Sequence, residues 1–195
     1  GASQGLGREI ASSLAAQGAA VIVAARSEGK LNDLVEEIAG AGGSATALAL
    51  DLSAPESFGE ALGTLPEEFA AVDILVNNAG ITRDGTLHRM DFEQWNAVLQ
   101  TNLSSCYNMC RSVIDGMRER GFGRIVNIGS VNGQAGQYGQ VNYAAAKSGI
   151  HGFTKALALE GAAKGVTVNA IAPGYVDTDM VRAVPEKVLE KIIAT

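Results

Sequence analysis

The sequence predicts an α/β fold: a doubly wound parallel sheet with helices on both faces. Short, continuously apolar runs of strand type alternate along the chain with longer stretches in which apolar residues recur every three or four positions. This alternation is typical of strand and helix units wound on a parallel sheet, whose strands are buried on both faces. The chain has 195 residues, 47% of them hydrophobic, which suits one domain, residues 1–195, with a sizeable core.

The first elements follow a glycine-rich turn. Leu6, Ile10 and Leu14 recur every four residues and predict a helix that begins directly after the turn and ends at Gly18. The run 20–25 has a β-branched centre and predicts a buried strand. A second amphipathic helix follows and ends at the glycines 42 and 43.

The same pattern continues along the chain. It predicts strands at 45–50, 74–76, 125–128 and 166–171, and helices at 58–65, 91–118 and 141–159. Pro185 suits the first turn of one more helix. The sequence shows no linker, internal repeat or charge block that would divide it.

Charge and composition exclude several functions. The chain carries 15 Lys and Arg against 21 Asp and Glu, and its basic residues form no cluster, which argues against nucleic acid as a partner. No run of about 18 uncharged apolar residues is present, so no membrane span is expected. Two Cys exclude a disulfide scaffold and, with no signal sequence visible, favour a cytoplasmic location.

Cys106 and Cys110 lie four apart on a predicted helix, a spacing that can supply two metal ligands. No further Cys and no nearby His completes a site, so we expect a buried apolar stripe and no metal. His88 and His151 are interpreted as a loop residue and a helix residue without a catalytic role.

The opening turn carries Gly1, Gly5 and Gly7 directly before a helix. Such a turn lets the backbone approach a pyrophosphate and points free N–H groups at its charge. An ordinary glycine-rich loop is the alternative. Where NAD-preferring enzymes usually carry a carboxylate, at the end of the strand 20–25, this chain has Arg26. Arg26 predicts an ion pair with the 2′-phosphate of NADP(H), unless it is simply solvated.

Tyr143 and Lys147 are four apart at the start of a predicted helix, so their side chains share a face. An adjacent ammonium lowers a tyrosine pKa from about 10, which would suit acid–base catalysis at neutral pH. Taken alone, the pair would more often be structural. Ser130 ends a predicted strand, where side chains face the ligand crevice of a parallel sheet, and Asn102 lies within the helix 91–118.

Together these motifs resemble the short-chain dehydrogenase/reductase family over the whole length of the chain. The elements in the family's order and spacing are the turn 1–7, Asp51-Leu52, 77–80, Asn102, Ser130, Tyr143-x-x-x-Lys147 and Pro173-Gly174. The resemblance implies a Rossmann-type fold. It also implies that Tyr143 is the general acid for a carbonyl oxygen and that Lys147 lowers its pKa and binds the nicotinamide ribose. Ser130 would hydrogen-bond the carbonyl oxygen, and Asn102 would hold a water linked to Lys147.

The same resemblance implies a cofactor site. The pyrophosphate would lie over the glycine turn, the adenine beside Asp51 and Leu52, and the nicotinamide beside residues 173–178. The residues expected to bind NADP(H) are Gly1, Ser3, Gln4, Gly5, Leu6, Gly7, Arg26, Asp51, Leu52, Asn78, Ala79, Gly80, Tyr143, Lys147, Pro173, Gly174, Val176 and Thr178.

Within the family, the stretch 77–180 is most similar to acetoacetyl-CoA reductases, which implies reduction of acetoacetyl-CoA to 3-hydroxybutyryl-CoA. The pocket for this short acyl thioester would contain Asp84, Ser130, Gln137, Tyr138, Gln140 and Tyr175. Amide side chains suit a thioester, which offers acceptors and no charge. A polar loop that merely lies nearby is the alternative for Gln137 and Gln140.

Two other functions stay open. Residues 1–75 look more like a 3-oxoacyl-[acyl-carrier-protein] reductase, and an acidic carrier protein would need a basic face, which Arg118, Arg120, Arg124 and Lys164 could supply. From a different class, the chain could be a non-catalytic NADP(H)-binding protein or an inactive fragment.

The helices 91–118 and 141–159 carry more apolar residues than one buried face needs, among them Val98, Tyr107, Ile114, Ala144, Ile150, Phe153 and Leu157. Relatives pair these helices, so we expect a homo-oligomer, specifically a tetramer. The family's first strand would precede Gly1 and its last elements would follow Thr195, so we expect the interior of a longer chain. Without that strand, the strands 20–25 and 74–76 would lack their shared hydrogen-bonding neighbour.

Overall fold

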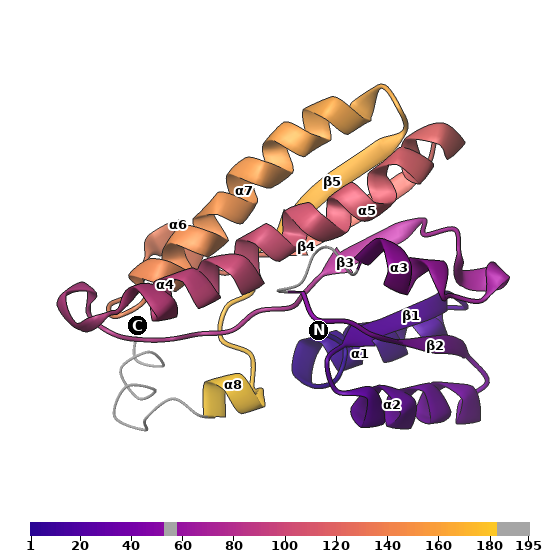
Figure 1. Ribbon diagram of the computed structural model, residues 1–195, viewed down its shortest axis with the longest axis horizontal. Helices are drawn as coiled ribbons and strands as arrows, with labels where there is room; N and C mark the ends of the chain where they lie inside the picture. Colours follow the sequence, from indigo (N-terminus) through magenta and orange to yellow (C-terminus); the bar gives the residue numbers. More distant parts are fainter. Residues whose placement is uncertain (53–57, 183–195) are drawn as a thin grey trace.

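The computed structural model describes residues 1–52 and 58–182, without the side chains of 179 and 180 (Figure 1). The elements in chain order are α1 (Gly5–Ala16), β1 (Ala20–Ala25), α2 (Glu28–Gly40), β2 (Ser44–Ala49), α3 (Phe58–Gly63), η2 (Glu67–Phe69), β3 (Ile74–Asn77), η3 (Leu87–Arg89), α4 (Phe92–Leu99), η4 (Gln100–Ser104), α5 (Ser105–Arg120), β4 (Gly123–Ile128), α6 (Asn132–Ala135), α7 (Val141–Ala162), β5 (Val166–Ile171) and α8 (Asp179–Arg182). The helix expected at Pro185 lies outside the described residues.

The strands form two parallel sheets, β1-β2 and β3-β4-β5. Ala20 of β1 pairs with Ser44 of β2, and Ile74 of β3 pairs with Arg124 of β4. Within the described part of the chain, β1 and β3 do not pair with each other. This confirms the prediction that these two strands lack a shared neighbour, and a cavity of about 400 Å³ lies between them.

Helices cover the β1-β2 sheet on both faces. Val23 packs with Ala11 of α1 and with Leu31 and Leu34 of α2. Ile22, whose side chain points to the other face of the strand, packs into a second cluster around Phe58 of α3. The doubly wound arrangement predicted from the sequence is therefore confirmed for this sheet.

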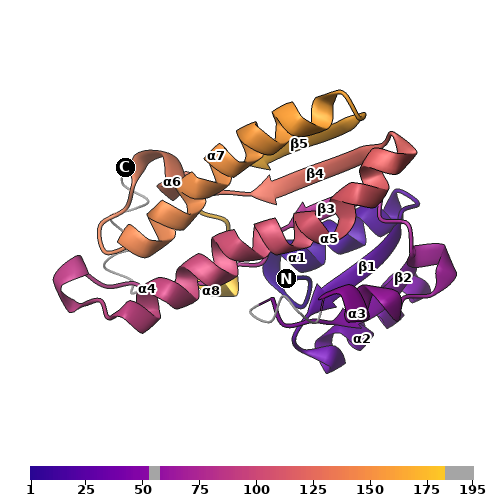
Figure 2. The same cartoon turned by 45° about the horizontal axis from the view of Figure 1, so that its top comes forward.

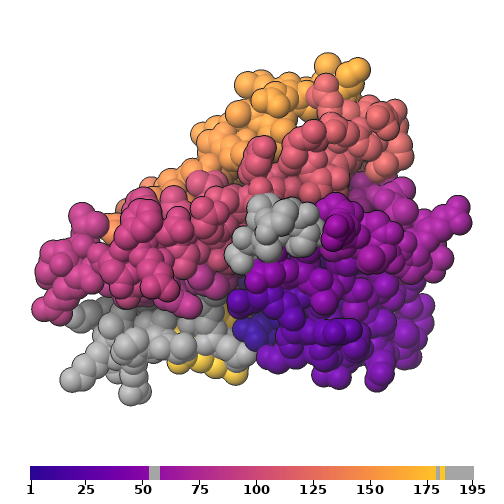
Figure 3. Space-filling model, viewed as in Figure 1, coloured from indigo at the N-terminus to yellow at the C-terminus, as the bar shows by residue number. Residues whose placement is uncertain are grey.

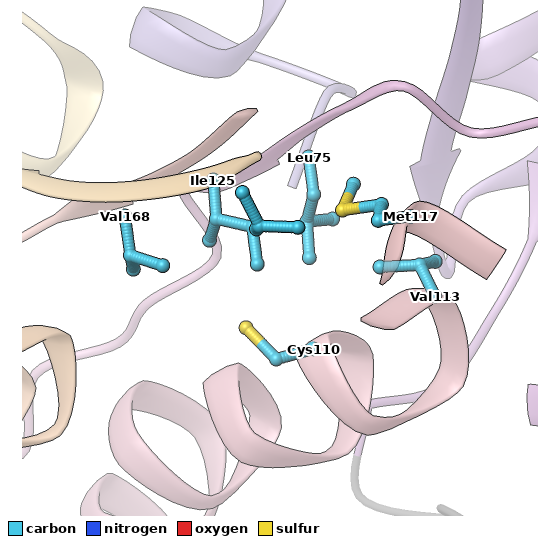
Figure 4. Close-up of a cluster of buried hydrophobic side chains, with 7 residues drawn as sticks. Leu75, Cys110, Val113, Met117, Ile125 and Val168 are labelled. Atoms are coloured by element: carbon cyan, nitrogen blue, oxygen red, sulfur yellow. The ribbon is translucent and has the colours of Figure 1, made fainter. Parts of the chain in front are cut away.

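The largest apolar cluster joins the β3-β4-β5 sheet to α5. Leu75, Ile125 and Val168 come from three adjacent strands and point toward Cys110, Val113 and Met117 of α5 (Figure 4). Phe153 and Leu157 of α7 pack against the same cluster. In the two cartoon views α5 and α7 run side by side across this face of the sheet (Figures 1 and 2).

The predicted single helix 91–118 is interrupted. α4 begins at a capping box formed by Asp91 and Gln94. It ends at the five-residue π-helical turn η4, after which α5 continues to a left-handed C-cap at Gly121. Asn102 lies at the centre of η4, and π-helical turns occur frequently at functional sites.

The apolar excess expected on the long helices is smaller than the sequence indicates. Val98 and Ile150 are fully buried within the chain itself, so they belong to the core and not to a second apolar face. Tyr107 is exposed. Among the described residues, no helix is both long enough and apolar enough to cross a membrane.

Candidate active site

A cavity of about 1100 Å³ opens at the carboxyl ends of the strands. Arg26 follows β1, Gly80 lies beyond β3, Ser130 lies beyond β4 and Pro173 lies beyond β5, and all four residues line it. In the space-filling view α3 of the N-terminal part lies directly against α5 (Figure 3). Ligands of open parallel sheets bind at this edge.

The glycine turn is packed as a cradle. A Cβ atom on Gly7 would overlap the Gly1 carbonyl oxygen and would lie 2.6 Å from Asn78 Nδ2. Asn78 Nδ2 donates to that same carbonyl oxygen at 3.1 Å, and Gly5 has a positive φ of 54°. α1 begins at Gly5 with no acidic residue in its first turn, so its N-terminus suits an anion.

Most of the expected cofactor residues surround the cavity. Those that line it are Gly1, Ser3, Gln4, Gly5, Leu6, Arg26, Asp51, Leu52, Asn78, Ala79, Gly80, Tyr143, Lys147, Pro173, Gly174, Val176 and Thr178. Gly7 lies behind the turn, against Gly1. Lys30, which sequence reasoning missed, also lines the cavity, and its Nζ donates to Gln4 Oε1 at 3.2 Å.

Ser130, Tyr143 and Lys147 meet in the same cavity. α7 presents Tyr143 and Lys147 one turn apart, with Lys147 Nζ 5.6 Å from the centre of the Tyr143 ring. Lys147 Nζ is buried and donates to the Ile128 carbonyl oxygen at 2.7 Å. Ser130 Oγ accepts the backbone N–H of Asn132 at 3.1 Å.

Burial is the largest cause of the pKa shifts of Tyr143 and Lys147. It raises the pKa of the Tyr143 hydroxyl, and the charges of Asp84 and Tyr175 act in the same direction, whereas a hydrogen bond with Ser130 lowers it. Burial also lowers the pKa of Lys147 to about 8. The spacing predicts that Lys147 lowers the Tyr143 pKa; in this structure the pKa is raised instead, chiefly by burial, and Ser130 is the group that lowers it.

Asn102 lies behind the cavity wall and does not line it. Its Nδ2 donates to the carbonyl oxygens of Ile81 and Val98 at 2.9 and 2.8 Å. Its Oδ1 is buried and finds no hydrogen-bond partner within residues 1–52 and 58–182. A Cβ atom on Gly80 would lie 2.5 Å from that oxygen, so only glycine fits between Asn102 and the cavity.

The expected substrate residues divide into two groups. Asp84, Ser130, Gln140 and Tyr175 line the cavity. Gln137 and Tyr138 are outside its lining, and Tyr138 is 88% exposed. Asn132 also lines the cavity, next to the first group. Sequence reasoning missed it, because its side-chain partners Gln140 and Tyr175 are brought to it only by the fold.

Cys106 and Cys110 are buried free thiols, and burial raises the pKa of both. The described residues contain no group of three or more His, Cys, Asp or Glu side chains that could hold a metal ion.

Comparison with known proteins identifies the family. The family model described as short chain dehydrogenase matches residues 1–189. The chain belongs to this family. Family membership implies that the cavity binds a nicotinamide cofactor, which agrees with the cradle at Gly7 and the crevice at the strand ends.

Two groups of reductases are similar to the chain. The acetoacetyl-CoA reductase of Shinella zoogloeoides is 60% identical over 144 residues, which is 73% of this chain and 60% of that protein. The 3-oxoacyl-[acyl-carrier-protein] reductase FabG of Escherichia coli strain K12 is 48% identical over 194 residues, which is 100% of this chain and 78% of that protein. The match to the first relatives thus spans about 60% of their length.

A solved structure has the same fold. The crystal structure of 3-oxoacyl-[acyl-carrier protein] reductase from Brucella melitensis ATCC 23457 superposes with a TM-score of 0.91 at 34% identity. The match covers 98% of this chain and 73% of that chain. The Rossmann-type fold expected from the motifs is thereby confirmed.

Proposed function

We propose that the protein is an NADPH-dependent reductase that converts a 3-oxoacyl thioester, acetoacetyl-CoA, into the 3-hydroxyacyl thioester. The observation that carries this proposal is the meeting of Ser130, Tyr143 and Lys147 in one cavity with the glycine cradle. The 60% identity to acetoacetyl-CoA reductases, which exceeds the 48% identity to FabG, supports CoA as the carrier.

In this proposal NADPH, when bound, supplies the hydride that adds to the carbonyl carbon at position 3 of the acyl chain. The Tyr143 hydroxyl donates its proton to the carbonyl oxygen, so the product is a neutral alcohol. Ser130 Oγ donates a hydrogen bond to that oxygen, and the Asn132 backbone N–H, which Ser130 Oγ accepts, orients the hydroxyl. Burial raises the Tyr143 pKa, so the phenol is protonated before reduction, although the raised pKa makes it a weaker proton donor.

The preference for NADP(H) over NAD(H) rests on the end of β1. Arg26 and Lys30 are exposed side chains that both line the cavity, and a cation at this position pairs with a 2′-phosphate. The catalytic residues in this assignment are Asn102, Ser130, Tyr143 and Lys147, of which Asn102 would act through a water bound behind Gly80.

An acyl-carrier-protein thioester is the second candidate, because FabG proteins match the chain over its whole length. Three of the four basic residues that could receive an acidic carrier already make contacts within the chain. Arg118 donates to the Glu160 carbonyl oxygen, Arg120 pairs with Asp73, and Arg124 donates to the carbonyl oxygens of Gly123 and Gly165. These contacts argue for structural roles and weaken the carrier-protein alternative.

Steady-state reduction by the full-length protein tests the proposal. We expect NADPH oxidation with acetoacetyl-CoA to exceed that with an acetoacetyl-carrier-protein thioester, and Tyr143→Phe to lower kcat by roughly 10²–10⁴-fold. Tyr107→Phe, an exposed tyrosine of α5, is the matched control and should keep wild-type kcat. A large preference for the carrier-protein thioester would establish the second candidate, and an active Tyr143→Phe would refute the catalytic assignment. Binding of NADPH without any turnover would refute the reductase and favour the non-catalytic NADP(H)-binding protein.

We also propose a homotetramer in the cytoplasm. Leu159, 82% exposed on α7, offers apolar surface for a second copy. Two free, buried thiols suit a reducing compartment. A monomeric sedimentation profile of the full-length protein would contradict the oligomer.

A further inference from the structure

A chain of four side chains forms one wall of the cavity. Gln140 Nε2 donates to Asp84 Oδ2 at 3.0 Å, and Asn132 Nδ2 donates to Gln140 Oε1 at 3.0 Å. The Tyr175 hydroxyl lies 3.4 Å from both the Oδ1 and the Nδ2 of Asn132. Gln140 and Asn132 each contact two other members through their side-chain amides, and Asn132 is the most buried of the four, at 9% exposed.

The carboxylate of Asp84 fixes the direction of the two hydrogen bonds between Asp84, Gln140 and Asn132. Asp84 only accepts, so the Nε2 end of Gln140 must face it and the Oε1 end must face Asn132. Oε1 only accepts, so Asn132 turns Nδ2 toward it. The Tyr175 hydroxyl lies at 3.4 Å from both ends of the Asn132 amide, so it can donate to Oδ1 or accept from Nδ2. The orientation of the two amides in the wall is thus defined.

Asn132 also connects this wall to the reacting atoms. It is two residues beyond Ser130, and its backbone N–H donates to Ser130 Oγ at 3.1 Å. Its helix, α6, packs closely against α7, because a Cβ atom on Gly133 would lie 2.7 Å from the Lys147 carbonyl carbon. The side chain of Asn132 is thus held in one place relative to Ser130 and Tyr143.

We propose that Asn132 is a positioning residue of the acyl pocket: it holds Gln140 in the single hydrogen-bonding orientation that receives an uncharged β-ketoacyl thioester. This inference rests on the proposed function. Within the described residues, Gln140 uses one amide N–H on Asp84, so its second N–H can donate to the substrate, which offers only acceptors at its two carbonyl groups. Rotation of either amide would present an acceptor instead, which a buried site tolerates poorly.

Exchanging the carboxylate and the amide between positions 84 and 132 of the full-length protein, here called the polarity exchange, tests the proposal. Asn132→Asp keeps the shape but replaces the donor to Gln140 with an acceptor, so Gln140 faces two carboxylates and can satisfy only one. In the double variant Asp84→Asn/Asn132→Asp, Gln140 can turn around and make both bonds again. Asn169→Asp, on an exposed residue of β5 outside the cavity, makes the same substitution as a control.

We expect Asn132→Asp to raise the KM for acetoacetyl-CoA roughly tenfold with a smaller loss of kcat and an unchanged KM for NADPH, because the backbone bond to Ser130 persists. The double variant should keep a raised KM, because Gln140 is then turned around relative to its wild-type orientation, although its internal hydrogen bonds are restored. An unchanged KM in Asn132→Asp, or a wild-type KM in the double variant, would overturn the proposal.

If the wild-type protein does not reduce acetoacetyl-CoA, the proposed function fails, but the polarity exchange remains measurable in urea unfolding. The orientation role then requires the double variant to be more stable than the sum of the two single changes. Additive losses would overturn it.

Discussion

Lys147 is a buried ammonium with one hydrogen-bond acceptor, the carbonyl oxygen of Ile128. Only 3% of its surface is exposed, so its charge has lost most of its hydration, and its pKa falls to about 8. This position places the amine beside Tyr143 and toward Gly80, where a Cβ atom would lie 3.6 Å from Nζ. The site therefore holds a cation at a cost in folding stability.

The cost makes stability depend on pH in a defined direction. In the unfolded chain Lys147 titrates near 10.5 and in the folded chain at about 8, so the unfolded state binds more protons between these values. Stability therefore rises with pH in this window, and below about pH 8 the penalty is constant. Relative to Lys147→Met, we expect wild-type unfolding free energy to increase by about 2 kcal/mol from pH 7 to pH 10.

Urea unfolding of both proteins at pH 7, 8.5 and 10 measures this difference. Lys155→Met changes an exposed lysine of the same helix and should follow wild type at each pH. Parallel stability curves for wild type and Lys147→Met would contradict a desolvated ammonium.

Sequence spacing identified the residues that we propose as catalytic, but it could not give their pKa values. The i, i+4 spacing of Tyr143 and Lys147 correctly places them on one face of α7. It contains no information about desolvation, which decides the direction of the Tyr143 shift. Asn132 was missed for a related reason, since its role depends on contacts with residues 84, 140 and 175 that only the fold brings together.

At the scale of elements, the strands were the most predictable part. β1 and β5 have the predicted bounds, and β4 begins two residues before the predicted 125. Strands were easy to locate because apolar residues concentrate in the buried strands of a parallel sheet. The interruption at η4 was not predictable. Spacings of three and four residues continue through Gln100–Ser104, and the extra residue of a π-helical turn shifts the helix without breaking that pattern.

The contact between α6 and α7 allows a test with two glycines. A Cβ atom on Gly133 would lie 2.7 to 2.9 Å from the carbonyl carbon and Cβ of Lys147 and the backbone nitrogen of Ser148. Gly133→Ala must therefore move α6 away from the turn that carries Lys147. We expect a loss of about 1–3 kcal/mol in unfolding free energy and a lower kcat, measured by urea unfolding and steady-state reduction.

Gly152→Ala is the matched control on α7. Nothing lies within 4 Å of a Cβ atom there, and Gly152 is exposed within the helix. This change should stabilise the protein by about 0.5–1 kcal/mol through helix propensity and should leave kcat unchanged. Equal effects of the two substitutions would show that the α6–α7 contact does not position Lys147.

At the scale of the whole molecule, the two sheets share one ligand cavity. Arg26, Lys30 and Asp51 approach it from the β1-β2 sheet, and Ser130 and Tyr143 approach it from the β3-β4-β5 part. β1 and β3 are not hydrogen-bonded to each other in the described residues. The two sheets are therefore held together by other contacts, including those across the cavity. A ligand that touches both sets of residues will stabilise their arrangement.

Cofactor-dependent unfolding of the full-length protein tests this arrangement and the cofactor preference together. A ligand at 100 times its Kd adds about 2.7 kcal/mol to the unfolding free energy. We expect NADP⁺ to raise the midpoint of thermal unfolding more than NAD⁺ at equal concentration, because Arg26 and Lys30 are positioned to pair with the 2′-phosphate. Arg26→Asp should reverse that order, since a carboxylate repels the phosphate and accepts from the ribose hydroxyls of NAD⁺. Arg89→Asp, on an exposed arginine outside the cavity lining, should keep the wild-type order. A preference for NADP⁺ that survives in Arg26→Asp would assign the phosphate contact to other residues and refute the role of Arg26.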